Sequence, residues 1–179
     1  MFATMYLPNF FLQAAIRHQE IGCTTPVALI DDRENKPLII QLNPAAETAG
    51  VRTGMSPTQG LARCLQLLIR SRSASKENAL GNVILQYCFS LSPTVEATAA
   101  GVWTIQFTRF HRLSDKMSSV LASLTSCGII AQAGIAPTPD MSFIAANLAT
   151  PLLEVHEVEK FLGPLPVDVL AIPFQRCLP

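Results

Sequence analysis

Carboxylates are scarce in the most strand-like stretch of this 179-residue chain, SPTVEATAAGVWTIQFT from Ser92 to Thr108. Glu96 is the only acid between Ala79 and Thr108. Two-metal catalysis requires several carboxylates that converge on ions about 3.5–4 Å apart, and one glutamate cannot supply them. The stretch therefore predicts a sheet that lacks the carboxylate ligands of a two-metal site.

The remaining reactive side chains give no recognisable catalytic motif. Asp31 and Asp32 stand in a polar loop with no third ligand nearby, which favours a solvated turn over a metal site. No Gly-rich nucleotide motif is present, and no histidine belongs to a nucleophile motif. The cysteines are odd in number and contain no CxxC pair, which is typical of reduced thiols in a cytoplasmic protein rather than of a zinc site: Cys23, Cys64, Cys88, Cys127 and Cys177.

Positive charge is concentrated in one part of the sequence, although the formal net charge is zero. No acid interrupts the stretch between Glu47 and Glu77, which carries Arg52, Arg63, Arg70, Arg72 and Lys76. From Asp140 onward acids prevail. Two interpretations stay open for the basic stretch, namely ordinary surface charge or a face that contacts phosphates.

Length and composition indicate one domain, or two small lobes, with enough apolar residues to bury a core. Apolar residues make up 49% of the chain and charged residues 15%, which excludes a disordered class. No apolar run approaches the length of a membrane span, and we expect no membrane partner. The apolar N-terminus is interrupted by Arg17, His18 and Glu20, so we expect a buried strand and helix rather than a signal peptide.

Turn and cap residues divide the chain into alternating strands and helices. Asn9 is expected to cap a helix that begins at Phe10, and Asn43 one that begins at Pro44. Gly54 is expected to allow a tight loop in VRTGMSP. Strands are expected at 94–99 and 102–108. One helix is expected before this pair in the sequence and another after it.

Five segments, in this order, resemble the Y-family translesion DNA polymerases: YLPNFFLQAAI, PVALIDD, NPAAETAGVRTGMSPTQGLARC, SPTVEATAAGVWTIQFT and GIIAQAGIAPTPDMSFIAANLA. Within that family the likeness is to the catalytically inactive ImuB-type subunits of the bacterial mutasome. The resemblance implies an α+β fold, a polymerase-like palm with a mixed or antiparallel sheet and helices on one face, and a small α/β fingers insertion. The implied boundaries are 1–9 with 76–155 for the palm, 10–75 for the fingers and 156–179 for the start of a thumb.

The residues that match the family's metal-binding acids are neutral here, at positions Tyr6, Pro8, Gly101, Val102 and Gln106. The positions that match the family's triphosphate contacts are Pro44, Glu47 and Asn147. Neutral and apolar side chains do not hold Mg²⁺ against water, and Glu47 repels a triphosphate. We therefore expect a pseudo-active site with no catalytic residue, no metal and no cofactor.

The resemblance implies a non-catalytic scaffold in translesion synthesis and DNA repair that binds primer–template DNA weakly. The DNA-facing residues expected by resemblance and charge are Arg52, Gly54, Met55, Arg63, Arg70 and Arg72. Further partners implied by the resemblance are the sliding clamp, a RecA-like accessory protein and a replicative-type polymerase, contacted mainly through regions that this chain lacks. Two alternatives stay open: an active polymerase or nucleotidyltransferase that recruits acids such as Asp31, Asp32 or Asp115, and a protein-interaction module without DNA binding.

Overall fold

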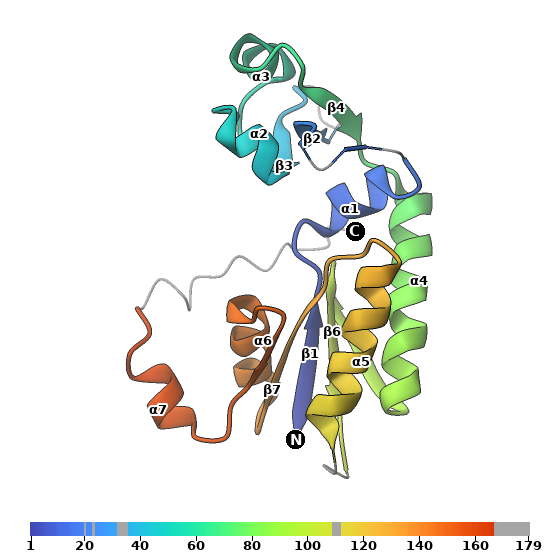
Figure 1. Cartoon of the computed structure of the whole chain (residues 1–179), viewed down its shortest axis with the longest axis vertical. Coiled ribbons are helices and arrows are strands. Elements are labelled where there is room, and N and C mark those ends of the chain that lie inside the picture. The colour runs from blue at the N-terminus through green and yellow to red at the C-terminus, as the bar shows by residue number, and fades with distance from the viewer. Residues whose placement is uncertain (20, 23, 32–35, 109–111, 167–179) are drawn as a thin grey trace. The chain divides into compact units, whose positions relative to one another are not determined.

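The protein forms two compact units in a computed structural model (Figure 1), which describes residues 1–19, 21–22, 24–31, 36–108 and 112–166. The large unit consists of Met1–Pro8 and the chain from Gly81 onward, and the inserted unit is Asn9–Leu80. These divisions lie one and five residues from the boundaries expected from the sequence, 9/10 and 75/76. Residues 156–166, expected to begin a thumb, cluster with the large unit.

A five-stranded sheet forms the centre of the large unit, in the order β5-β6-β1-β7-β8. β1 is antiparallel to both of its neighbours, and β7 is parallel to β8, so the sheet is mixed. The strands are β1 (Phe2–Tyr6), β5 (Thr94–Ala99), β6 (Val102–Gln106), β7 (Gln132–Ala136) and β8 (Leu152–Glu154).

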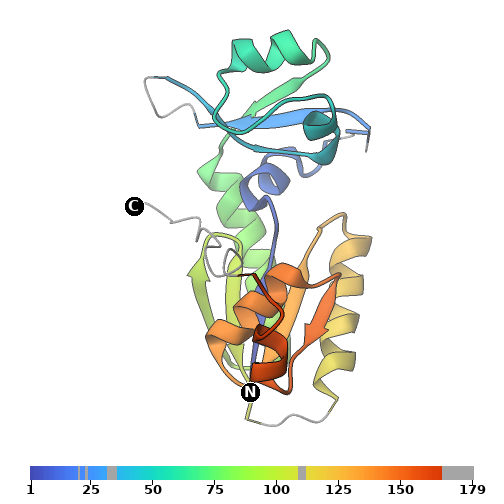
Figure 2. The same cartoon turned by 90° about the vertical axis from the view of Figure 1, so that its left-hand side faces the viewer.

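The α+β fold class with a mixed sheet is confirmed, but helices cover both faces of the large unit's sheet, whereas one covered face was expected. α4 (Ala74–Leu91) and α5 (Leu113–Ser126) lie together, and α6 (Pro139–Leu148) lies on the opposite face (Figure 1). Figure 2 turns the molecule so that α6, in orange, comes forward. α7 (Val158–Leu162) follows β8. The core between the sheet and the helices α4 and α5 includes Ile84, Cys88, Ile105, Met117 and Ile135, each fully buried.

α6 approaches the sheet so closely that only glycine fits beneath it. A Cβ atom on Gly134 would lie 2.2 Å from the Ala146 nitrogen and 2.2 Å from the Ser142 carbonyl oxygen, which is far inside van der Waals contact. The same approach brings the Thr4 and Ser142 hydroxyls to 2.7 Å, where they form a buried hydrogen bond. The sheet and α6 are thereby fixed in one register.

The inserted unit is a three-stranded sheet, in the order β3-β2-β4, with three short helices. β2 is antiparallel to β3 and parallel to β4. Its apolar cluster includes Ala28, Ile39, Val51 and Leu67. The elements are α1 (Phe10–Ile16), β2 (Val27–Ile30), β3 (Ile39–Leu42), α2 (Pro44–Thr48), α3 (Pro57–Arg63) and β4 (Leu68–Ser71).

α1 and α2 begin at Phe10 and Pro44, as expected, and two of the three helices of the inserted unit carry a side-chain cap. The Asn43 side chain accepts a hydrogen bond from the Ala46 N–H, as expected for a cap of α2. Ser56 and Gln59 form a reciprocal capping box at α3. The expected cap at Asn9 is wrong: its backbone is left-handed with φ 50°, and its side-chain amide donates to the Leu42 carbonyl.

No helix in the described part of the chain is long and apolar enough to cross a membrane.

Candidate functional site

Tyr6, Gly101 and Val102 come together at one end of the β1–β6 pair. Tyr6 lies directly opposite Val102 in the antiparallel register. The Leu7 N–H donates to the Gly101 carbonyl at 2.8 Å, and Gly101 has φ 77°, a turn conformation that glycine adopts without strain. Three of the positions expected, by resemblance, to match the family's acids thus adjoin in space, and none carries a carboxylate.

Tyr6 forms an aromatic pair with Phe143 of α6. The rings of Tyr6 and Phe143 meet edge to face, with centroids 6.5 Å apart and planes at 80°. Tyr6 is half-buried, and this burial raises the pKa of its phenol, which keeps the hydroxyl neutral at physiological pH. Phe143 was not among the residues expected at this site. Asn147, the position aligned with a triphosphate contact of the family, donates its amide to the Phe143 carbonyl within α6.

Pro8 and Gln106 are the other two positions expected to match the family's acids, and they lie at different ends of the β1–β6 pair. Pro8 follows the end of β1, next to the Tyr6 site. Gln106 lies at the opposite end of β6, where it pairs with Phe2. Gln106 is four residue steps along the strand from Val102, about 13 Å at 3.3 Å per residue. The side chain of Gln106 is therefore not a neighbour of the Tyr6 site.

The chemistry available at the Tyr6 site is that of a neutral surface. Among the described residues, no three His, Cys, Asp or Glu side chains gather as a group that could hold a metal ion. Glu96 lies on the edge strand β5 opposite Thr104 and is exposed. A phenol, an aromatic ring and a valine can pack or stack, but they supply no anionic ligand for a hard cation.

Arg52 and Arg63 are exposed in the inserted unit. Arg52 donates to the carbonyls of Glu47 and Val51, at 2.7 and 2.8 Å, which orients its guanidinium without neutralising it. Arg63 stands in the last turn of α3 and has no salt bridge among the described residues. Both side chains can therefore meet an anion from solvent.

Arg70 and Lys76 both reach the end of α1. The Arg70 Nε donates to the Gln19 side chain at 3.1 Å, and the Lys76 ammonium donates to the Ala15 carbonyl at 3.1 Å. Neither has a carboxylate partner among the described residues. Lys76 belongs to the basic stretch but was not among the DNA-facing residues expected from the sequence, and its contact with Ala15, 61 residues away in the chain, could not be read from it.

Arg72 is held inside the inserted unit by two acids and an aromatic ring. Its guanidinium forms ion pairs with Glu77 at 2.7 Å and Asp31 at 3.4 Å, and lies 3.8 Å from the Phe11 ring centroid. The hydrogen bond with Glu77 is the main reason that the pKa of Arg72 is raised. Its charge is compensated, so we remove Arg72 from the DNA-facing set.

The Gly54–Met55 loop is tied to β3 by backbone hydrogen bonds. The Gly54 N–H donates to the Ile39 carbonyl and the Ile39 N–H donates to the Met55 carbonyl, both at 2.8 Å. Gly54 has φ 83°, as the expected tight loop requires, and Met55 packs against the apolar cluster. Pro44 and Glu47 stand in the first turn of α2, where Glu47 is exposed and keeps a negative charge on this unit.

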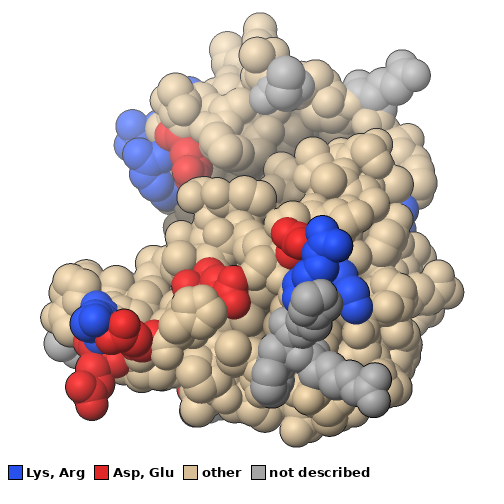
Figure 3. All heavy atoms as spheres, turned by 60° about the horizontal axis from the view of Figure 1, so that its bottom comes forward, with Lys and Arg blue, Asp and Glu red and all other residues tan. Residues whose placement is uncertain are grey.

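Charged side chains on the molecular face in Figure 3 form small groups, in several of which blue and red adjoin. Exposed short-range ion pairs of this kind occur at Arg112–Asp115 and Lys160–Glu157. Such pairs leave little net field, so any contact with an anion depends on individual unpaired cations.

The fold is similar to that of solved DNA polymerase structures. The insertion ternary complex of Dbh DNA polymerase matches with a TM-score of 0.81 and 16% identity, over 94% of this chain and 53% of that chain. DinB from Sulfolobus solfataricus matches with a TM-score of 0.80 and 17% identity, over 94% and 52%. This chain therefore spans about half the length of those proteins, and the likeness shows the Y-family palm fold.

The sequence itself matches a family model. No curated protein sequence matches the chain. Residues 5–147, which include the Tyr6 site and all of the inserted unit, match the model of the impB/mucB/samB family. This protein belongs to the impB/mucB/samB family.

Proposed function

We propose that this chain is a non-catalytic, polymerase-like module of DNA damage tolerance, of the ImuB type, which binds primer–template DNA weakly and serves as a scaffold. One observation carries the proposal. The end of the β1–β6 pair, where the family resemblance implies metal-binding acids, presents Tyr6, Gly101 and Val102 with the Phe143 ring beside them.

A divalent ion at this place would lack a ligand set. Mg²⁺ is bound through carboxylates and substrate phosphates, and it gives up its water shell reluctantly. Tyr6 offers a neutral phenol that burial keeps protonated. Without ions to neutralise the developing charge, phosphoryl transfer loses its main source of transition-state stabilisation.

DNA contact is assigned to Arg52, Arg63 and Arg70, with Lys76 beside Arg70. These cations belong to the inserted unit and have no carboxylate partner among the described residues. Phosphate contacts of this kind give non-specific affinities on the order of 10⁻⁴–10⁻⁶ M that fall with salt. The scaffold role, with the sliding clamp, a RecA-like protein and a replicative-type polymerase as partners, is the part of the proposal that rests on the resemblance alone.

The DNA assignment is tested by fluorescence anisotropy with a labelled primer–template at low salt. Replacing Arg52, Arg63 and Arg70 together by Gln should weaken binding at least tenfold. The slope of log K against the logarithm of the salt concentration should become shallower by the amount that corresponds to about three phosphate contacts. Arg112→Gln is the matched control, because that exposed arginine is paired with Asp115 in the large unit. Unchanged binding in the triple variant would remove DNA from the proposal and favour the protein-interaction alternative.

The active-polymerase alternative is tested by primer extension with Mg²⁺ and with Mn²⁺. Two acids that it would recruit are already engaged, since Asp31 pairs with Arg72 and Asp115 pairs with Arg112. Asp32 lies outside the described residues. Nucleotide incorporation above that of a mock preparation, lost on replacing Asp31 or Asp115 by Asn, would establish this alternative instead.

A further inference from the structure

The sheet of the large unit ends in two edge strands, β5 and β8, which differ in how they are protected. β8 is only three residues long, and Pro151 directly precedes it. β5 is six residues long, contains no proline and no basic residue, and has four of its residues exposed. Short length, proline and lysine are common means by which an edge strand avoids pairing with another chain. β5 is therefore the edge that is open to pairing.

The hydrogen bonds between β1 and β6 determine which groups of β6 face β5. The Leu7 N–H donates to the Gly101 carbonyl at 2.8 Å, and the Phe107 N–H donates to the Met1 carbonyl at 2.9 Å. Hydrogen bonding alternates along an antiparallel pair. The odd-numbered residues of β6 therefore bond to β1, and its even-numbered residues face β5.

Val95 and Ala97 direct their backbone N–H and C=O groups away from the sheet. Thr94 and Glu96 stand opposite even-numbered residues of β6, so their backbone groups bond inward. The outward groups of Val95 and Ala97 have no hydrogen-bond partner in the described part of the chain. The two residues are spaced so that one added strand can bond to both of them.

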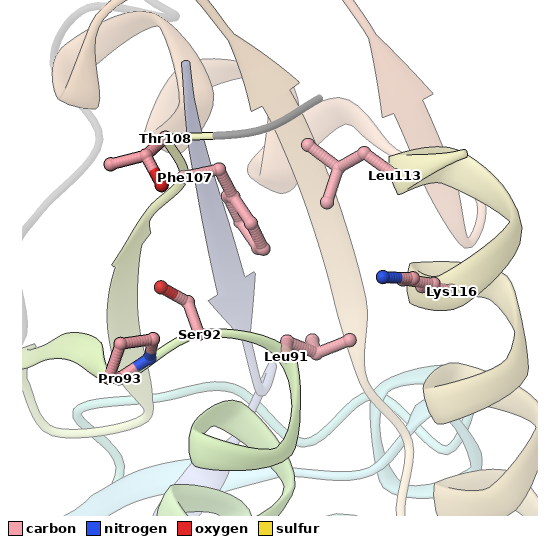
Figure 4. Close-up of a pocket in the computed structure, with 7 residues that line it drawn as sticks. All are labelled: Leu91, Ser92, Pro93, Phe107, Thr108, Leu113 and Lys116. Carbon is pink, nitrogen blue, oxygen red and sulfur yellow. The ribbon is translucent and has the colours of Figure 1, made fainter. Parts of the chain in front are cut away.

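The open segment of β5 is bounded at each end. Figure 4 shows Ser92, just before β5, in the wall of a small pocket. Its hydroxyl donates to the Gln106 carbonyl at 2.6 Å and accepts from the Thr94 N–H at 3.3 Å, which anchors the start of the strand. At the other end the register with β6 shifts between Ala97 and Ala99, which is a β-bulge. An added strand can pair only with the segment between the anchor and the bulge.

Glu96 places a negative charge in the middle of this segment. Its side chain is exposed and forms no ion pair with any described residue. Because Glu96 bonds inward to β6, a residue opposite it on an added strand would form a pair without hydrogen bonds, where side chains come closest. An opposite charge at that place is favourable, and a like charge is unfavourable.

A second copy of the chain fits this edge poorly. The alignments of two β5 strands about a twofold axis are centred on Glu96, Val95 or Ala97, because outward groups must meet outward groups. Alignment on Glu96 places two carboxylates directly opposite each other. Alignment on Val95 places Pro93, which has no N–H, opposite Ala97. Alignment on Ala97 places Ala99, beyond the bulge, opposite Val95.

We propose that β5 is a docking site for an extended peptide of a partner protein, which adds as an antiparallel outer strand and places a lysine or arginine opposite Glu96. The peptide residues on either side of that cation bond to the backbone of Val95 and Ala97. β-Branched apolar residues suit these two positions, because they favour strands and can pack beside the half-buried Val95. The site lies in the large unit and does not depend on the proposed DNA contacts, which belong to the inserted unit.

The test is a titration of the ¹⁵N-labelled full chain with the capped peptide Thr-Val-Lys-Val-Thr, followed by NMR. The amides of Val95 and Ala97 should shift most, because their N–H groups gain hydrogen bonds, with a dissociation constant on the order of 1 mM. The same peptide with Glu in place of Lys should bind at least tenfold more weakly. The peptide with both valines N-methylated cannot donate to β5 and should cause no shifts.

Two variants locate the contacts on the protein. Glu96→Gln should reduce the preference for the Lys peptide over the Glu peptide to less than threefold, and Glu159→Gln, at another exposed acid, is the matched control that should leave the preference unchanged. Ala97→Pro removes an N–H that β6 does not use, and proline is tolerated at such edge positions. This variant should weaken binding of the Lys peptide at least tenfold while the amides of β6 keep their chemical shifts.

The proposal would be overturned by the absence of shifts at Val95 and Ala97, by equal binding of the N-methylated peptide, or by an unchanged preference in Glu96→Gln. Shifts of these two amides on raising the protein concentration without peptide would show that a second copy occupies β5 instead. If Ala97→Pro does not fold, the N-methylated peptide tests the same hydrogen bonds on the unchanged protein. Loss of DNA binding in the arginine variants would leave these outcomes unaffected.

Discussion

The Arg72 guanidinium lies 3.8 Å from the centroid of the Phe11 ring while it pairs with Glu77, so one side chain joins α1 to the start of α4. Asp31, at the end of β2, is its third partner. Arg72 and Glu77 keep only 19% and 10% of their side chains exposed, so little solvent screens the pair.

Replacing Arg72 by Met should lower the free energy of unfolding by about 2–4 kcal/mol, because it leaves the Glu77 carboxylate buried without its main partner. Urea unfolding of the full chain measures this loss. Arg63→Met, at an exposed position, is the control, and its free energy of unfolding should stay within about 0.5 kcal/mol of the wild-type value. Equal stability of the two variants would show that the Arg72 contacts contribute nothing net.

Gly134→Ala should prevent stable folding or cost at least about 3 kcal/mol. The new methyl group would lie 2.2 Å from backbone atoms of α6, which cannot rotate away as a side chain can. Gly81→Ala is the matched control: its nearest contact would be the Trp103 ring at 3.9 Å, and Ala is the better helix former. Circular dichroism melts should show the first variant unfolded or much less stable and the second at least as stable as wild type.

We expect the protein to lose stability at alkaline pH because the Cys88 thiol is buried. Burial raises the pKa of its thiol from 9.0 to about 12, so the folded protein keeps a proton that the unfolded chain releases. Stability from this group is complete below pH 9 and falls between pH 9 and about 12. At pH 10 the loss should be about 1 kcal/mol.

The measurement for Cys88 is urea unfolding at pH 8 and pH 10, for wild type and for Cys88→Val. The valine variant has no thiol to ionise, so its stability should change less between the two pH values. An identical pH dependence in both proteins would contradict the assignment of this effect to Cys88.

Much of the fold could be predicted from local signals. Gly54, Gly101 and the Asn43 cap lie where the turn and cap rules place them. Asn9 did not follow the cap rule because its side chain finds a tertiary partner in the Leu42 carbonyl. β8 was missed because three residues that pair with β7 are too short to show a period.

The resemblance grouped Tyr6, Gly101, Val102 and Gln106 in one expected site, and strand register decides which of them meet. The register of β1 and β6 brings Tyr6 opposite Val102 but places Gln106 opposite Phe2, at the other end of the pair, and the sequence alone does not fix that register. Phe143 was missed because its place beside Tyr6 is decided by how α6 docks on Gly134. The neutralisation of Arg72 was missed because one of its partners, Asp31, lies 41 residues away.

The absence of a divalent-metal site at Tyr6, Gly101 and Val102 is tested most directly by adding Mn²⁺ to the ¹⁵N-labelled chain and following paramagnetic broadening. A variant with Tyr6→Asp and Gly101→Asp is the positive control, since it places two carboxylates on adjoining residues and should gain broadening there. In the wild-type protein, the amides of Tyr6, Leu7 and Val102 should keep their intensity at Mn²⁺ concentrations that broaden the control. Selective broadening of these amides in wild type, reversed by excess Mg²⁺, would contradict the non-catalytic assignment.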